Sequence, residues 1–223
     1  MEFTLCVANS SHHSWATTIC NMMEEAAKIR GTGIAKRKPA YVQKKMTEGK
    51  AVIAFQEAEV IGFCYIENWE GEKYVANSGL IVHADFRNSG LARAIKKAIF
   101  NLSKQKYPNA KLFGITTSMA VMKINSDLGY QPVTFSELTQ DETFWKGCQS
   151  CRNHDILQRT ERKMCLCTGM VCDLSKISQS QTEINKQEAW DSFQSFMKER
   201  EIRLQEKESL FQFNQQKNNE NEK

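Results

Sequence analysis

The chain has 223 residues and a formal net charge of +4, with 30 Lys and Arg against 26 Asp and Glu. This length allows one full domain with a sizeable core and an appendage. The charge excess is small, and no basic block or basic–aromatic alternation accompanies it, so we expect no nucleic-acid partner. No apolar run approaches the roughly 20 residues of a membrane span, and the N-terminus lacks a signal pattern. We therefore expect a cytoplasmic protein with no membrane partner.

The first part of the chain predicts a strand, two helices and three antiparallel strands. The link between the helices, Arg30–Lys38 (RGTGIAKRK), is basic and contains two glycines. Pro39 suits the first turn of the second helix. Polar turns separate the three later strands. The expected elements are a strand at 3–8, helices at about 13–29 and 40–48, and strands at 51–55, 60–68 and 74–82.

The stretch 78–100 predicts a buried strand, a tight turn and an amphipathic helix. Leu91, Ile95 and Ile99 recur at helical spacing on one face, and we place Lys96, Lys97 and Lys104 off that face. The free N–H groups and dipole of the helix start attract an anion. Gly90 allows close approach to the backbone, and Arg87 adds a positive charge. The turn therefore predicts a phosphate-binding site.

The second part predicts a strand at 111–117, a helix at 118–128 closed by Gly129, and a strand at 130–135. A final strand is expected at 163–172. After a Ser- and Gln-containing linker, residues 188–213 have the pattern of an amphipathic helix. We expect this helix to pack on its own domain or on a second copy in a homodimer, and residues 215–223 to be disordered.

Arg87, Gly90 and Ala92 fill the pattern Arg/Gln-x-x-Gly-x-Gly/Ala after a strand ending in Val. With the order of the flanking elements, this turn resembles the pyrophosphate loop of the GNAT superfamily of acyl-CoA-dependent N-acyltransferases. The resemblance covers about residues 1–173 and implies an α/β (α+β) fold, a mixed central sheet flanked by helices, with 174–223 as linker, helical tail and disordered end. It implies acetyl-CoA or another acyl-CoA as co-substrate. The CoA-binding residues that it implies are Ile81, Val82, Arg87, Asn88, Ser89, Gly90, Leu91, Ala92 and Asn125.

A second family signature is altered in this chain. Gly129-Tyr130 matches the usual Gly-Phe, but Asn125 stands where the family usually has a tyrosine that protonates the CoA thiolate. An amide cannot do this, and Tyr130 and Ser126 are the nearby substitutes. By the same resemblance, a backbone N–H at about 81–83 stabilises the thioester oxyanion. The candidates for a base that accepts the amine proton are Glu67, Glu70, Glu72, Tyr74 and His83. From these sets we select Tyr130, Glu67 and Tyr74 as catalytic residues.

The basic link between the first two helices predicts the acceptor side of the site. In GNAT folds these helices form one wall of the acceptor site, and Arg binds carboxylates with two parallel hydrogen bonds. We predict that Arg30, Thr32 and Arg37 contact a small amine acceptor, with an acidic amino acid as one candidate. The alternatives are a merely solvated basic loop and, less compatible with this charge, acetylation of a protein or peptide.

Five of the eight cysteines, Cys148, Cys151, Cys165, Cys167 and Cys172, fall in one short region. The first four form C-x2-C and C-x-C pairs whose spacing allows a structural zinc site. The alternative is that they pack as buried thiols. They belong to a segment, about 144–167, inserted before the last strand. The chain also resembles a GNAT subgroup with an appended Cys-rich segment that is proposed to acylate glutamate.

These observations predict an N-acyltransferase that moves an acetyl or related acyl group from acyl-CoA to a small amine. The rival hypothesis is a non-catalytic acyl-CoA-binding or zinc-bearing interaction module. Asn125, in place of the usual tyrosine, favours that rival.

Overall fold

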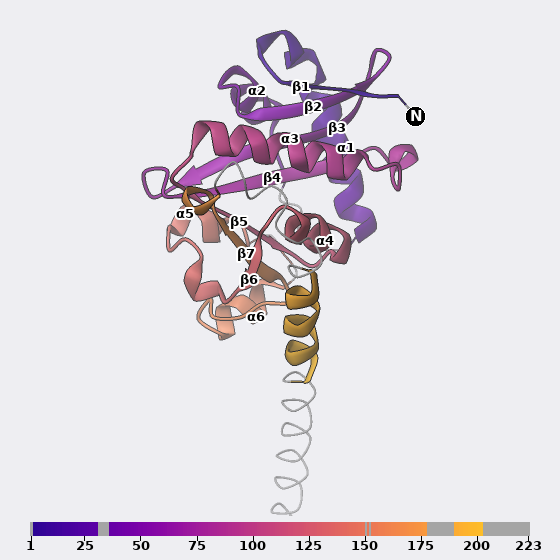
Figure 1. The fold of residues 1–223 in the computed structure, drawn as a ribbon. Helices are drawn as coiled ribbons and strands as arrows, with labels where there is room; N and C mark the ends of the chain where they lie inside the picture. Colours follow the sequence, from indigo (N-terminus) through magenta and orange to yellow (C-terminus); the bar gives the residue numbers. More distant parts are fainter. Residues whose placement is uncertain (1, 31–35, 150, 152, 178–189, 203–223) are drawn as a thin grey trace, which may run out of the picture.

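The computed structural model describes residues 2–30, 36–149, 151, 153–177 and 190–202, apart from the side chain of Arg30. A seven-stranded mixed sheet with the order β1-β2-β3-β4-β5-β7-β6 runs through the molecule, and helices cover both of its faces (Figure 1). This confirms the predicted fold class. The strands are β1 Thr4–Val7, β2 Ala51–Gln56, β3 Glu59–Trp69, β4 Tyr74–Val82, β5 Lys111–Thr116, β6 Gln131–Val133 and β7 Thr168–Asp173. The α-helices are α1 Ala16–Arg30, α2 Pro39–Thr47, α3 Leu91–Lys106, α4 Met119–Asp127, α5 Glu142–Lys146 and α6 His154–Arg159.

The β4–β5 pair is the one parallel pair in the described sheet, and it is short. It runs only from Tyr74↔Lys111 to Ala76↔Phe113. Beyond these residues β4 and β5 continue without pairing to each other. The sheet is therefore split between its two central strands, and a ligand can reach the backbone of both.

A bulge interrupts β4 beside this split. The β3–β4 register passes from Phe63↔Ile81 to Tyr65↔Ser78, so Gly79 and Leu80 together face one residue of β3. Gly79 has a φ of +65°, and a Cβ there would lie 2.4 Å from the ring of Tyr65. The bulge therefore requires glycine for its backbone angle and for its packing.

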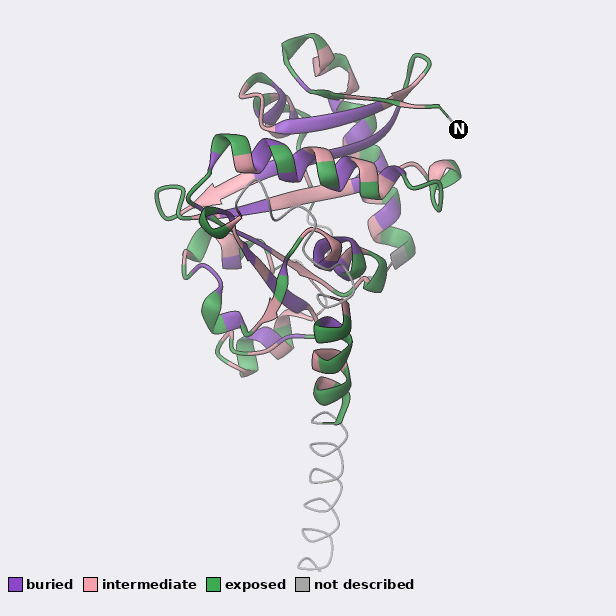
Figure 2. Cartoon of the chain, viewed as in Figure 1, coloured by how far each residue is buried: buried purple, intermediate pink, exposed green. Residues whose placement is uncertain are grey.

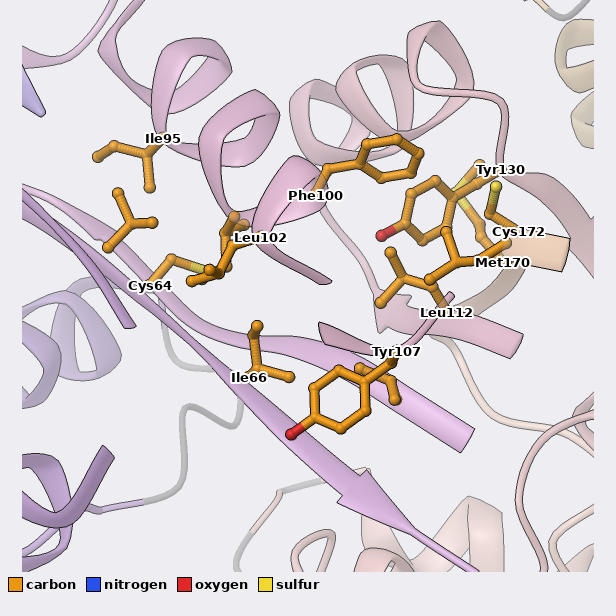
Figure 3. Close-up of a cluster of buried hydrophobic side chains, with 14 of the residues drawn as sticks. Cys64, Ile66, Ile95, Phe100, Leu102, Tyr107, Leu112, Tyr130, Met170 and Cys172 are labelled. Atoms are coloured by element: carbon orange, nitrogen blue, oxygen red, sulfur yellow. The ribbon is translucent and has the colours of Figure 1, made fainter. Parts of the chain in front are cut away.

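The alternation of β3 side chains divides the interior into two cores. Cys64 and Ile66 pack with Ile95 and Ile99 of α3 in a core that extends to Tyr130 and Cys172 (Figure 3). Phe63 and Tyr65 point to the opposite face, where they pack with α1 and α2. Figure 2 shows buried strands between helices whose outer surfaces are exposed. We call the sheet face that packs against α3 the α3 face, and the face that packs against α1 and α2 the α1/α2 face.

Two expectations from the sequence are wrong at the level of the elements. Strand β7 begins at Thr168, so Cys165 and Cys167 precede the strand instead of forming part of it. Lys96, expected off the apolar face of α3, is only 4% exposed. Lys96 shares helical spacing with Phe100 and Ser103, which are also buried, so the buried stripe of α3 is wider than the aliphatic residues alone indicate.

Part of the tail lies within the described residues. Residues 190–202 are helical. Phe193 is buried in the core of the α3 face, Trp190 and Met197 pack against that core, and Lys123 Nζ lies 3.9 Å from the Trp190 ring centroid. This part of the tail therefore packs on its own domain, while the predicted linker and disordered end lie outside the described residues. Within the described part of the chain, none of the helices has the length and apolar character that a membrane crossing needs.

Candidate active site

A cavity of about 780 Å³ opens where β4 and β5 separate. Its floor is formed by residues of both strands around the split, and side chains from both faces of the sheet reach it. The lining includes Arg37, Glu67, Asn77, Gly79, Leu80, Lys96, Gly114, Asn125, Cys148 and Cys165. On β4 the lining comprises 76–80, so the bulge contacts the cavity, whereas Ile81 is buried in the core of the α1/α2 face and Val82 packs toward α3.

The predicted phosphate loop precedes α3 as an exposed turn. Gly90 is the N-cap of α3 with a φ of +83°, and no side chain caps the helix there. Ser89 Oγ donates to the Phe86 carbonyl at 2.6 Å and accepts from the Leu91 N–H at 3.4 Å. Asn88 also has a positive φ, of 62°. The helix start therefore offers N–H groups and a partial positive charge to an anion.

Glu67 lines the cavity with a carboxylate that lies on the α1/α2 face of the sheet. The Nζ of Lys45, from α2, lies 3.1 Å from Oε1 and donates to Oε2 at 3.1 Å. Burial raises the pKa of the Glu67 carboxyl to about 7, and the positive charge of Arg37 opposes that rise. Lys45 also favours the ionised form. The carboxylate is therefore available to accept a proton near neutral pH.

The other four predicted bases do not line the cavity, and three of them lie in structural contacts. Glu70 accepts from Thr139 Oγ1 at 2.6 Å and from the Gln140 N–H at 2.8 Å. Glu72 lies in the exposed β3–β4 turn. The ring of Tyr74 packs edge-on against Phe113, with the centroids 6.1 Å apart, and His83 Nδ1 lies 3.7 Å from Asp85. Of the five, the structure brings only Glu67 to the cavity.

A polar cluster of the α3 face lies at the split. Asn77 Oδ1 accepts from the Tyr130 hydroxyl at 3.2 Å and from Lys96 Nζ at 3.4 Å, and Asn77 Nδ2 donates to Ser103 Oγ at 2.8 Å. Burial raises the pKa of the Tyr130 hydroxyl well above its usual range. Asn125 lies beside this cluster, with Nδ2 3.9 Å from Met170 Sδ, and its Oδ1 has no hydrogen-bond partner in the described structure.

The two sequence-predicted residues of this region, Asn125 and Tyr130, differ in their access to the cavity. Asn125 and Lys96 line the cavity, whereas Tyr130 is fully buried and does not belong to the lining. Tyr130 is thus placed as a support for Asn77. Lys96 was missed from the sequence because it was assigned to the solvent face of α3. Its helical spacing to Phe100 and Ser103 is the signal that could have located it.

Of the three residues predicted to bind the acceptor, Arg37 is the one that the described structure places at the cavity. Its Nε donates to the Tyr65 hydroxyl at 2.6 Å, and its guanidinium lies 6.0 Å from the ring centroid of Tyr41. These contacts hold a positive charge on the α1/α2 face, the face of Glu67. Thr32 and the side chain of Arg30 lie outside the described residues.

The cavity lining also contains the four cysteines predicted to bind zinc, Cys148, Cys151, Cys165 and Cys167. Among the described residues, no three His, Cys, Asp or Glu side chains are placed to hold a metal ion, so the zinc prediction is not supported. Cys165 packs with Trp145 and Leu157, and Cys148 and Cys167 lie against that cluster. Burial and then the neighbouring thiols raise the pKa of Cys148 to about 11 and of Cys167 to about 12. Cys148, Cys165 and Cys167 pack in an apolar cluster, which agrees with the alternative left open by the sequence.

Comparison with known proteins agrees with this geometry. Residues 19–120 match the model of the acetyltransferase (GNAT) family, whereas no curated protein matches the chain. The N-acetylglutamate synthase of Neisseria gonorrhoeae, complexed with coenzyme A and N-acetyl-glutamate, superposes with a TM-score of 0.56 at 14% identity over 78% of this chain and 35% of that one. A Mycobacterium tuberculosis protein in complex with CoA gives 0.53 at 13% identity, covering 76% and 98%. The Salmonella typhimurium protein yncA, with acetyl-CoA, gives 0.54 at 12% identity, covering 80% and 97%.

The chain spans about a third of the length of the Neisseria synthase. At these identities the structural matches show a common fold, and the family match adds a sequence relationship over the segment that contains α2, the split and the phosphate loop. Residues 19–120 are therefore similar in sequence to the acetyltransferase (GNAT) family, and the chain shares the fold of solved N-acetyltransferases.

Proposed function

We propose that this protein transfers an acetyl or related acyl group from acyl-CoA to the amine of a small acidic acceptor, with an acidic amino acid as the first candidate. The observation that carries this proposal is Glu67, a largely buried carboxylate in the cavity whose pKa is raised to about 7 by burial. Amide formation requires a neutral amine and a group that takes its second proton. In this proposal Glu67, in the cavity beside the split, is the base that takes this proton.

Acyl-CoA would bind with its pyrophosphate at the N-terminus of α3 and its thioester in the split. The left-handed Gly90, which has no side chain to cap the helix, supports the first contact. The bulge supports the second, since it leaves one residue of the pair Gly79 and Leu80 outside the strand ladder. The N–H of that residue is our candidate donor to the thioester oxyanion, one or two residues before the range 81–83 expected from the resemblance.

The acidic acceptor is inferred from Arg37. Its guanidinium lines the cavity on the face of Glu67 and suits a carboxylate of the acceptor. The Neisseria synthase, solved with N-acetyl-glutamate in one structure and L-arginine in another, supports a small acceptor in this fold. With Glu67 facing the amine and Arg37 facing a carboxylate, the cavity suits an amino acid better than a polyamine. A cytoplasmic location and a homodimer stay predictions.

The test is a CoA-release assay with acetyl-CoA and succinyl-CoA against the twenty amino acids and several polyamines. We expect turnover confined to acidic amino acids. Arg37→Gln should raise KM for that acceptor about tenfold or more, the value of one charge-assisted contact, with little change in KM for acyl-CoA. Lys28→Gln, which removes an equal charge from an exposed pair on α1, is the control.

A second candidate function is an acyl-CoA-binding module without turnover. Asn125 favours it, because this amide lines the cavity without being able to protonate a thiolate. Tight CoA binding with no product from any amine would support this module and contradict the transferase.

A further inference from the structure

Lys96 is a buried ammonium that the proposed transfer leaves without a role. It is 4% exposed, yet it lines the cavity. An ammonium has three donors, and the hydrogen bond that the described structure gives to Nζ is a long one, 3.4 Å to Asn77 Oδ1. The ring centroid of Tyr130 lies 5.3 Å away. A buried cation with so few partners costs stability, and a ligand that pairs with it would offset that cost.

The position of Lys96 relative to Glu67 indicates which ligand atom it would meet. Glu67 comes from β3 on the face covered by α1 and α2, where Lys45 holds it. Lys96 comes from α3 on the other face, beside Asn77. Both side chains reach the same cavity through the split in the sheet. A thioester in that split would have the acceptor amine on one face and could present its sulfur to the other.

We propose that Lys96 donates the proton that converts the departing CoA thiolate into the thiol. The inference rests on the proposed transfer and adds its acid. The amine nitrogen forms the new C–N bond and gives one proton to Glu67. The C–S bond breaks with its electron pair on sulfur, and the sulfur takes a proton from Lys96 Nζ. Solvent then returns the proton from Glu67 to Lys96, so the sum is amine plus acyl-CoA giving amide plus CoA.

The other groups near the sulfur position are less suited to this role. Asn125 has an amide and no transferable proton. Tyr130 does not line the cavity, and its hydroxyl donates a hydrogen bond to Asn77. Ser126 is buried, and its Oγ has no partner in the described structure. Cys64, the titratable group of β3 that faces Lys96, donates to the Ser78 carbonyl. Burial lowers the pKa of Lys96 toward that of a thiol, which favours proton transfer between them.

The experiment compares the wild-type protein with Lys96→Met and Lys96→Arg. Lys97→Met, on the exposed side of the same helix turn, is the matched control. We expect Lys96→Met to lower kcat at least about tenfold. It should also remove the fall of kcat at high pH that deprotonation of Lys96 causes in the wild type. Lys96→Arg should keep the charge but transfer the proton poorly. An unchanged kcat and pH profile in Lys96→Met would overturn the proposal.

A binding measurement tests the contact with sulfur without turnover. Affinities for CoA and desulfo-CoA are measured at pH 6 and pH 9 for wild type and Lys96→Met. We expect the wild type to prefer CoA over desulfo-CoA more strongly at pH 9, where the thiolate forms, and the variant to lose that gain. An equal loss of both ligands at both pH values would show a structural role and overturn the proposal. If the gain is present but no amine is acylated, the transferase proposal fails, while the contact between Lys96 and sulfur stands.

Discussion

Glu67 and Lys96 line one cavity from opposite faces of the same sheet. They can do so because β4 and β5 pair over only three positions and then separate. Since burial acts on both groups, it raises the pKa of the carboxyl and lowers that of the ammonium. The two groups therefore approach the pH range in which a base and an acid can both exchange protons.

The first prediction concerns Glu67. Glu67→Gln should lower kcat/KM at pH 8 about 100-fold, the usual loss for a general base. Because the carboxylate acts only when ionised, the wild-type to variant ratio should rise with pH and level off above its pKa of about 7. The ratio cancels the titration of the amine itself. Glu72→Gln, in the exposed β3–β4 turn, is the control, and a pH-independent ratio would exclude Glu67 as the base.

The second prediction concerns the phosphate loop. Gly90→Ala should weaken CoA binding, measured by titration calorimetry, because the residue must keep a φ of +83° beside the ligand. The backbone strain alone costs about 1 kcal/mol of stability. Gly71→Ala is a matched control, since Gly71 also has a positive φ, of +63°, and open space around its Cβ, but lies in the β3–β4 turn. Equal CoA affinity in the two variants would contradict the loop assignment.

The third prediction concerns the bulge. Gly79→Ala places a methyl group 2.4 Å from Tyr65 Cε1 and 3.0 Å from Met23 Cε, at a φ of +65°. We expect a loss of about 2 kcal/mol or more in the free energy of unfolding, from overpacking and strain together. Gly114→Ala, across the split, meets only Asn125 Nδ2 at 3.6 Å and should change stability little. Denaturant unfolding of both variants measures the difference, and similar midpoints would show that the bulge can relax.

The fourth prediction concerns the stability cost of Lys96. At neutral pH Lys96→Met should be more stable than the wild type by about 1–3 kcal/mol, because it removes a buried and poorly paired charge. The folded state lowers the pKa of Lys96 below its ordinary 10.5, so the unfolded chain binds more protons between the two values. Wild-type stability should therefore rise with pH in that range, and the gap should close as pH approaches 10.5. A gap that stays constant from pH 7 to 10 would show that Lys96 binds its proton equally in the folded and unfolded states, so that folding does not lower its pKa.

The sequence alone determined the order of the elements and predicted the phosphate loop, because both patterns are local. Periodicity and turn residues fix a helix or strand within a few positions, and a glycine turn at a helix start attracts an anion wherever it lies. The loop pattern of Arg87, Gly90 and Ala92 could therefore be recognised in the sequence, and strands β2, β3 and β4 could be predicted from it. The sequence could not single out Glu67 among five candidate bases, because its burial and its proximity to Lys45 depend on contacts between distant segments.

The tertiary structure decided which polar groups meet in the split. The sequence predicted Lys96 on the solvent side of its helix. The width of the buried stripe of α3 depends on the packing of β3, β4 and α4 against it, and a helical pattern does not contain that information. Cys165 and Cys167 looked like paired ligands in a strand, but the chain enters β7 only at Thr168, and Cys165 packs into an apolar cluster. Contacts across long stretches of chain set burial and hence pKa, and for that reason the proposed chemistry of this site could not be assigned from local patterns.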